Sequence, residues 1–419
     1  MSAQRARQRA ICIAAQSTPA DLTELAELLR TAGVAVVGEL VQLRERPHPA
    51  SYLGSGKLDE LKELVRSLDA NVVACDDELS PRQERALEGA LEAAVIDRTA
   101  IILDIFARHA NSSEGKLQVE LAQLEYNLAR MRGLWTHLER LGGGVGTRGP
   151  GEAQIETDRR LARNRIATLR RRLAHVQGGR EVMRRERERS HVPQIALAGY
   201  TNAGKSSLLR ALTGADVSVA DRLFHTLDPT TRALEINGRD YLLTDTVGFI
   251  RKLPHQLVDA FAATLEETRR ASLIIHVVDA SAPREDVEEM TQAVEDVLEE
   301  IGAGDLPRLL VLNKADLLGE DAHAGAWNGR RDALLVSAQT GAGLDGLRER
   351  IDATFVRALE PVELLLPYSE GSSLAELHAI AGELHREDTE QGVRVTALLP
   401  PATAARFARF AVSSNGPAR

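Results

Sequence analysis

The sequence predicts an α/β protein with several domains. Short apolar runs of strand length alternate with longer runs in which apolar residues recur at helical spacing. Glycine-rich or polar motifs follow several of the strand-like runs directly, and such loops gather at the carboxyl edge of an open parallel sheet, where ligands bind. A chain of 419 residues has room for about two to four domains.

Residues 1–110 predict a small N-terminal α/β domain, because helix-like and strand-like segments alternate there. A favoured N-cap residue followed by a proline marks the start of one of the helices. The expected helices are 21–32, 57–68 and one that begins at Ser80-Pro81, and the expected strands are 34–43 and 71–75.

Residues 111–190 predict a helical hairpin with a glycine-rich tip and a basic linker. Apolar residues recur at helical spacing in 114–141 and again in 152–177, with a glycine-rich loop between them. Two long helices joined by a short loop form a hairpin. Gly178-Gly179 is expected to end the second helix, so the charged stretch that follows is interpreted as a linker.

The charge of the chain is concentrated in this hairpin. The net charge is −9, yet residues 128–190 contain sixteen arginines, no lysine and seven acidic residues, so that the rest of the chain carries −18. A charge run is usually a solvated helix face with internal ion pairs, and composition alone leaves phosphate contact equally open. Because a guanidinium fork bonds two phosphate oxygens at once, the candidate RNA contacts are Arg148, Arg159, Arg160 and Arg163.

Residues 191–359 begin with a phosphate-binding motif. The apolar run 195–198 precedes it and a helix-like run follows it, which is the strand–loop–helix context that the motif needs. The glycines allow backbone N–H groups to surround the phosphates, Lys205 reaches the outer phosphates, and Ser206 is placed to ligate Mg²⁺. The motif comprises Gly199, Tyr200, Thr201, Asn202, Ala203, Gly204, Lys205 and Ser206.

Two later motifs indicate guanine as the base. A carboxylate at Asp316 accepts from both N1–H and the exocyclic amine of guanine, and adenine does not offer that pair. A backbone N–H near Ser337 meets the guanine carbonyl. Each motif follows an apolar run, and together they comprise Asn313, Lys314, Ala315, Asp316, Ser337, Ala338 and Gln339.

A third motif, between these, predicts the response to the γ-phosphate. Asp245, Thr246, Val247 and Gly248 end the apolar run 241–244. Asp245 holds the Mg²⁺ shell through water, and the Gly248 N–H bonds the γ-phosphate until hydrolysis removes that group. Four motifs in this order predict a P-loop NTPase (Ras-like) G domain with a parallel-rich sheet.

The residue after this motif predicts slow intrinsic turnover. Ras-like enzymes use a glutamine there to orient the attacking water. Phe249 stands at that position in this chain, and a phenyl ring orients no water and is expected to pack. We therefore expect slow hydrolysis that a partner stimulates.

The remaining features concern the tail and the cellular setting. Residues 360–419 predict a small C-terminal α/β domain with strands at 362–366 and 393–399.

Two cysteines form no disulfide framework, and no apolar run has the length of a membrane span, so we expect a cytoplasmic protein. An aromatic content of 3% argues against base stacking as a mode of RNA reading.

Three features together resemble the HflX family of bacterial ribosome-associated GTPases, over residues 40–355. They are the phosphate loop as written above, the continuation Phe249-Ile250-Arg251-Lys252-Leu253-Pro254, and the hairpin tip Gly142-Gly143-Gly144-Val145-Gly146-Thr147-Arg148-Gly149-Pro150-Gly151-Glu152. The segment Tyr52-Leu53-Gly54-Ser55-Gly56-Lys57 fits the same family.

The resemblance implies a GTPase that binds the large ribosomal subunit and its RNA, and that splits or rescues stalled ribosomes under stress. It implies that the hairpin tip reaches toward the peptidyl-transferase region. It also implies that Thr226 ligates Mg²⁺, with Thr230 as the alternative, and that Lys205, Thr226 and Gly248 serve catalysis. The implied GTP-binding residues of this loop are Phe224, His225, Thr226, Leu227 and Asp228.

Some alternatives stay open at this point. A regulatory GTP switch that recruits a protein partner, without ribosomal RNA, would use the same nucleotide motifs. Asn202 makes K⁺ a candidate second cation, because relatives use an asparagine there to hold one. Residues 54–57 are either a second nucleotide site or a tight turn that begins a helix. We expect a monomer.

Overall fold

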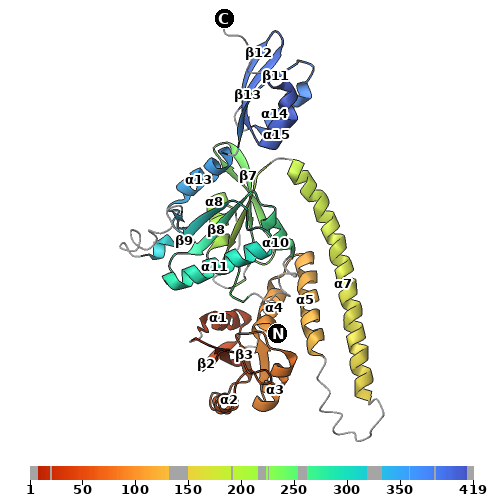
Figure 1. The fold of residues 1–419 in the computed structure, drawn as a ribbon, viewed down its shortest axis with the longest axis vertical. Helices are drawn as coiled ribbons and strands as arrows, with labels where there is room; N and C mark the ends of the chain where they lie inside the picture. Colours follow the sequence, from red (N-terminus) through yellow and green to blue (C-terminus); the bar gives the residue numbers. More distant parts are fainter. Residues whose placement is uncertain are drawn as a thin grey trace.

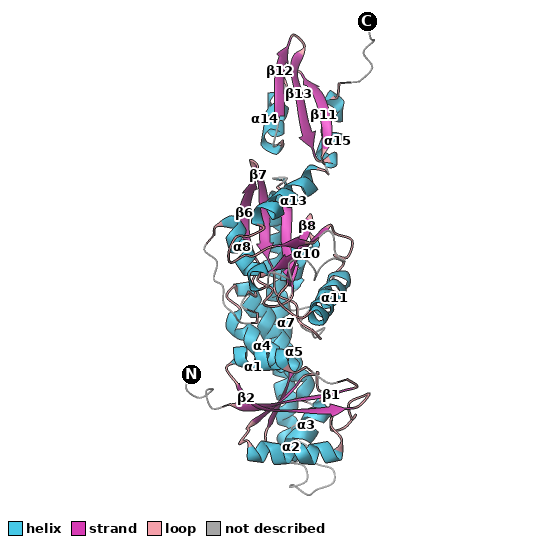
Figure 2. Cartoon of the chain, turned by 90° about the vertical axis from the view of Figure 1, so that its left-hand side faces the viewer, coloured by secondary structure: helices cyan, strands magenta, loops and turns pink. Residues whose placement is uncertain are grey.

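The computed structural model describes residues 8–18, 21–131, 150–189, 192–215, 223–224, 226–252, 262–318, 333–357, 359–381 and 384–412. Three sheets follow one another along the long axis of the molecule, with helices α4 (Arg98–His109) and α5 (Ser113–Arg130) between the first two (Figure 2). No helix in the part of the chain that is described combines the length and apolar composition needed to cross a membrane.

The first sheet is parallel throughout and has the strand order β2-β1-β3-β4. Its apolar faces are covered by helices, and α3 starts with a capping box in which Ser80 and Gln83 bond each other's backbone. Its strands are β1 (Arg9–Gln16), β2 (Ala35–Leu43), β3 (Val72–Cys75) and β4 (Ala94–Asp97), and the accompanying helices before α4 are α1 (Thr23–Ala32), α2 (Ser55–Ser67) and α3 (Pro81–Leu91).

Two long helices run side by side from this first part of the molecule (Figure 1). They are α5 and α7 (Pro150–Arg189). Arg165 and Arg170 of α7 form ion pairs with Glu120 and Glu125 of α5. Part of the arginine-rich charge therefore pairs internally.

The expectation that Gly178-Gly179 ends the second helix, with a linker beyond it, is wrong. The helix α7 continues through both glycines to Arg189. Each glycine in a helix interior costs only about 1 kcal/mol relative to alanine. The flanking residues are mostly arginine, glutamate, leucine and alanine, which favour a helix. The predicted end of the first helix at residue 141 and the glycine-rich tip lie outside the described residues.

The second sheet confirms the parallel-rich α/β G domain that the motifs predict. Its order is β10-β9-β8-β5-β7-β6, and within the described residues its β6–β7 pair is antiparallel while the other pairs are parallel. Its strands are β5 (Gln194–Gly199), β6 (Thr230–Ile236), β7 (Arg239–Asp245), β8 (Leu273–Asp279), β9 (Arg308–Asn313) and β10 (Leu334–Leu335), with α8 (Lys205–Thr213), α10 (Ala262–Arg269), α11 (Arg284–Glu300), the short η2 (Ala315–Leu317) and α13 (Leu344–Val356).

The third sheet is antiparallel and has the order β11-β13-β12. The sequence predicts β11 and β13, whereas β12 is polar and mostly exposed, so its sequence has no apolar alternation to reveal it. The elements are β11 (Glu360–Leu366), α14 (Gly371–Ile380), β12 (Leu384–Thr389), β13 (Gly392–Leu399), α15 (Pro401–Phe407) and η3 (Ala408–Phe410).

One apolar core spans the boundary between the first sheet and the G domain. Phe106 of α4 packs edge to face on Phe224, with ring centroids 4.6 Å apart and planes at 78°. Phe249 and Ile250, which follow the third motif, belong to the same buried cluster. Both loops that the motifs predict to respond to nucleotide are therefore packed against N-terminal elements.

Asp352 of α13 accepts three hydrogen bonds from the turn of the β6–β7 hairpin and the strand that follows it. Asn237 Nδ2, Arg239 Nη1 and the Tyr241 hydroxyl donate to its carboxylate at 2.9, 3.1 and 2.8 Å. Burial by itself would raise the pKa of Asp352, but these three hydrogen bonds outweigh burial and lower the pKa.

We predict that Asp352→Ala lowers the free energy of unfolding by about 1–3 kcal/mol at pH 7, because it leaves the three donors without their acceptor. A carboxyl whose pKa is lower in the folded state stabilises the fold above its unfolded pKa of about 4, and loses that effect as the pH falls further. The difference in thermal midpoint between the variant and wild type should shrink as the pH falls through 4.

The matched control is Glu349→Ala, which removes one acidic residue from an exposed position of the same helix. Its thermal midpoint should stay close to that of the wild type. Equal losses in both variants would contradict the assignment, as would a difference that grows toward acid pH.

Candidate nucleotide-binding site

The phosphate loop has the conformation that its glycines allow. Gly204 has φ 90°, which is left-handed, and a Cβ there would stand 2.2 Å from Nδ2 of Asn313. A Cβ on Gly199 would stand 2.2 Å from the carbonyl oxygen of Val277. Glycine is thus required at both positions by close approach, and at Gly204 by the backbone angle as well. Helix α8 begins directly after the loop, which points its N-terminus at the site.

Lys205 is buried inside the loop, with 6% of its surface exposed. Its Nζ donates to the carbonyl oxygens of Gly199 and Tyr200 at 3.0 and 2.8 Å. Burial lowers the pKa of Lys205 to about 8, and the nearby charge of Asp245 opposes that shift. A buried ammonium group gains strongly from an anionic phosphate.

Ser206, Thr226 and Asp245 come together from three separate segments. Ser206 Oγ donates to Asp245 Oδ2 at 2.5 Å and lies 2.9 Å from Thr226 Oγ1. Burial raises the pKa of Asp245, although Lys205 and Ser206 oppose the shift. Its Oδ1 is buried without a hydrogen-bond partner in the described part of the chain. Oxygen atoms of this kind are the ligands that Mg²⁺ prefers, so the residues fit that ion.

Thr230, the alternative to Thr226, has a different place. It begins β6 and pairs with Asp245 in the strand register. The threonine beside the Ser206 hydroxyl is therefore Thr226. His225, which lies between Phe224 and Thr226 in the sequence, is outside the described residues.

The two base motifs meet at the end of β9. Asn313 donates from Nδ2 to the Ala203 carbonyl at 2.9 Å and accepts at Oδ1 from the Ala338 N–H at 3.0 Å. It thereby ties the phosphate loop to the last motif. The Ser337 hydroxyl donates to the Asp316 carboxylate. Lys314 forms an ion pair with Asp279 at 2.6 Å, and Gln339 is exposed at the edge of the group.

The third motif lies against the phosphate loop. The backbone carbonyl oxygen of Phe249 accepts a hydrogen bond from the Thr201 N–H at 2.7 Å. The backbone N–H of Phe249 donates to the Gly199 carbonyl oxygen at 3.1 Å. A Cβ on Gly248 would stand 2.8 Å from Thr201 Cα and 3.0 Å from Lys205 Nζ. The ring of Phe249 is 1% exposed, so it packs in the core as expected.

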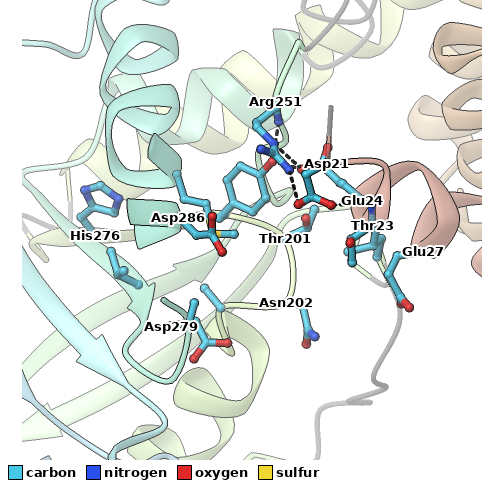
Figure 3. Close-up of a pocket in the computed structure, with 16 residues that line it drawn as sticks. Asp21, Thr23, Glu24, Glu27, Thr201, Asn202, Arg251, His276, Asp279 and Asp286 are labelled. Carbon is cyan, nitrogen blue, oxygen red and sulfur yellow. Dashed lines mark hydrogen bonds and ion pairs between the residues drawn. The ribbon is translucent and has the colours of Figure 1, made fainter. Parts of the chain in front are cut away.

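Sequence reasoning missed the N-terminal residues that line one flank of the loop. A cavity of about 220 Å³ is lined by residues of α1, the phosphate loop, β8 and α11. Figure 3 shows Arg251 pointing at Asp21 and Glu24, with N–O distances of 3.5 and 3.4 Å. The Tyr200 hydroxyl donates to Glu24 and accepts from the Arg251 N–H.

Lys252 continues this contact on the first sheet. Its Nζ lies 2.9 Å from Asp76 and 2.6 Å from Asp77, which follow β3. The Arg251-Lys252 pair is visible in the sequence after the third motif. The acidic partners of Lys252 lie 176 and 175 residues earlier in the chain, and no local pattern connects them.

The hairpin candidates are not part of the nucleotide site. Arg159 and Arg163 lie 3.9 and 3.6 Å from Glu156 of the same helix. Arg160 is exposed, and Arg148 lies outside the described residues. The side chains of Arg163 and Glu156 are largely exposed, which leaves their ion pair weak, whereas the side chain of Arg159 is only 16% exposed.

Three segments of the chain match known families. Residues 19–107 match the family described as GTP-binding GTPase N-terminal, residues 109–187 match GTP-binding GTPase Middle Region, and residues 194–314 match 50S ribosome-binding GTPase.

Curated relatives match nearly the whole chain. GTPase HflX of Caldanaerobacter subterraneus subsp. tengcongensis is 46% identical over 413 residues, which are 98% of this chain and 95% of the relative. GTPase HflX of Escherichia coli K12 is 47% identical over 382 residues, which are 90% of this chain and 89% of the relative.

A solved structure with a related sequence is the GTP-binding protein from the hyperthermophilic archaeon Sulfolobus solfataricus in complex with GDP. It is 27% identical, with a TM-score of 0.42, and the match covers 83% of this chain and 98% of that one. The curated relatives carry the assignment: this chain belongs to the GTPase HflX family and binds and hydrolyses GTP.

Proposed function

We propose that this GTPase binds the large ribosomal subunit through its helical hairpin and uses GTP to split or rescue stalled ribosomes under stress. One observation carries the proposal: Asp228, two residues after Thr226, is held at the start of α5, the first arm of the hairpin. A change at the γ-phosphate therefore has a direct path to the hairpin. The family description 50S ribosome-binding GTPase supports the same partner.

The geometry supports the following nucleotide roles. Lys205 and the backbone N–H groups of the loop hold the phosphates, and Gly248 is placed to bond the γ-phosphate with its N–H. Asp316 and Ser337 hold guanine. Mg²⁺, when bound, would neutralise charge on the phosphates, and Ser206, Thr226 and Asp245 would hold it.

The intrinsic rate is proposed to be slow. Phe249 is buried and orients no water, so the free enzyme lacks the group that Ras-like enzymes use for this purpose. A partner that completes the site would raise the rate, and the ribosomal subunit is the proposed partner.

Sedimentation of the protein with large ribosomal subunits, in a non-hydrolysable GTP analogue, tests the proposed function. We expect co-sedimentation with the analogue and less with GDP. Absence of binding, combined with normal GTP hydrolysis, would favour the alternative of a switch that recruits a protein partner.

We predict that Asp316→Asn lowers GTP affinity by about a hundredfold or more and shifts preference toward xanthosine triphosphate, because an amide pairs with the xanthine carbonyl. Competition binding with both nucleotides measures the shift. Asp345→Asn, which removes the same charge at a side chain 97% exposed on α13, should keep GTP preference. Wild-type GTP affinity in Asp316→Asn would overturn the base assignment.

We predict that replacing Arg159, Arg160 and Arg163 together with alanine weakens subunit binding and flattens its salt dependence, by about one unit of the log–log slope for each phosphate interaction removed. The matched variant replaces the same three residues with lysine. It should keep the salt slope, because the charge remains, and lose less affinity, because only the planar fork is gone. Identical salt slopes for the alanine variant and wild type would refute the proposed interaction.

We predict that K⁺ stimulates hydrolysis more than Na⁺ at matched ionic strength, by supplying positive charge beside the phosphates. Asn202 lines the cavity next to the loop, in a left-handed conformation with φ 61°, and its amide oxygen suits a monovalent cation. Asn202→Ala should remove the difference between the two salts. Equal wild-type rates in both salts would exclude the second cation.

A further inference from the structure

The carboxylate of Asp228 is bound at the N-terminus of α5. Its Oδ2 accepts from the backbone N–H groups of Asn111 and Ser112 at 2.9 and 2.7 Å. Its Oδ1 accepts from the Ser112 hydroxyl. The partners are more than a hundred residues apart in the sequence, and the contact joins the loop of the G domain to the first arm of the hairpin.

The electrostatics of this contact are favourable. An N-terminal helix end carries partial positive charge, and α5 is 18 residues long. Ser112 also caps the helix, because its Oγ accepts from the Gly115 N–H at 2.9 Å. Hydrogen bonds to an ionised acceptor are stronger than neutral ones. Asp228 is therefore an anchor, and its carboxylate faces α5.

Gly115 makes room for this anchor. A Cβ built there would stand 2.5 Å from Asp228 Oδ1 and 3.1 Å from Ser112 Oγ. Alanine is ordinarily preferred to glycine within a helix. The glycine in the first turn of α5 thus matches the space that the carboxylate occupies.

Thr226 is fixed on both sides by N-terminal elements. Two residues before it, Phe224 packs on Phe106 of α4 and is 2% exposed. Two residues after it, Asp228 is held at α5. Between these anchors, Thr226 Oγ1 lies 2.9 Å from Ser206 Oγ. Displacing either anchor would shift the threonine hydroxyl.

We propose that Asp228 is a positioning residue for GTP hydrolysis. Held by the start of α5, its carboxylate keeps Thr226 Oγ1 beside Ser206 and Asp245, where a Mg²⁺ ligand is needed in the GTP state. The inference rests on the proposed metal role of Thr226 and deepens it. It assigns the placement of that ligand to the hairpin rather than to the G domain alone.

The test compares two glycine-to-alanine variants at the same position of two helices. Gly115→Ala places a methyl group against Asp228. Gly346→Ala, in the first turn of α13, adds the same methyl group where nothing lies within 4 Å. We expect Gly115→Ala to raise the Mg²⁺ concentration for half-maximal hydrolysis and to lower kcat by about tenfold. GDP affinity should change by less than about twofold, because the Thr226 interaction is proposed for the GTP state. Gly346→Ala should match wild type in all three measurements.

Variants of Asp228 keep the test decisive if Gly115→Ala folds poorly. Asp228→Ala should reproduce both the Mg²⁺ shift and the loss of kcat. Asp228→Asn should recover most of the rate, because its oxygen still accepts from the two N–H groups and its amide donates to Ser112. An Asp228→Ala variant with wild-type Mg²⁺ dependence would overturn the proposal, whatever its thermal midpoint.

Thr226→Ala separates this inference from the proposed metal role. A wild-type rate in Thr226→Ala would refute the metal role itself. A large loss in Thr226→Ala, with none in Gly115→Ala or Asp228→Ala, would refute the positioning role and leave the metal role intact. If the proposal holds, Asp228→Ala added to Thr226→Ala should cost little more, because both act on one interaction.

Discussion

The structure depends on one apolar core, which the two loops that contact the phosphate loop share with N-terminal elements. Phe224 and Phe249 are 2% and 1% exposed, and both belong to the cluster that contains Phe106 of α4. Burying side chains of this size stabilises each loop by about 1.5–3 kcal/mol per side chain. The conformation of these two loops therefore depends on the placement of the N-terminal elements.

Buried charges give this junction its orientation. Arg98 is 3% exposed and pairs with Asp76 and Glu24, and burial lowers its pKa to about 10. Burial raises the pKa of Asp76, although Lys252 opposes the shift. A buried ion pair adds little net stability, because desolvation offsets attraction, but a misplaced partner leaves an unpaired charge. Arg251 and Lys252 extend this network from the G domain to Glu24 and Asp76 of the N-terminal part.

The hairpin connects to the same junction through its first arm, α5, and the second arm, α7, pairs with α5. Arg130 at the end of α5 bonds Asp97 and Glu84 of the first sheet's domain and lies over the Tyr126 ring at 3.4 Å. Ion pairs at Arg165 and Arg170 then join α7 to α5. The start of α5 holds Asp228. Charged contacts thus connect the two arms of the hairpin to the loop that bears Thr226.

The sequence by itself determined the nucleotide chemistry, because the phosphate loop and the base motifs are local: each is a strand end followed by residues whose types are dictated by phosphate or guanine. It also predicted several of the described helices and strands from local periodicity, among them α1, α2 and β2, but not α4, α11, β1 or β8. It failed at Gly178-Gly179, where the helix continues, and at the polar edge strand β12. Tertiary structure alone decided which residues surround the loops. Glu24, Asp76 and the start of α5 reach the site through contacts between distant segments, and no sequence period encodes a charge pair that forms only when two folded domains meet.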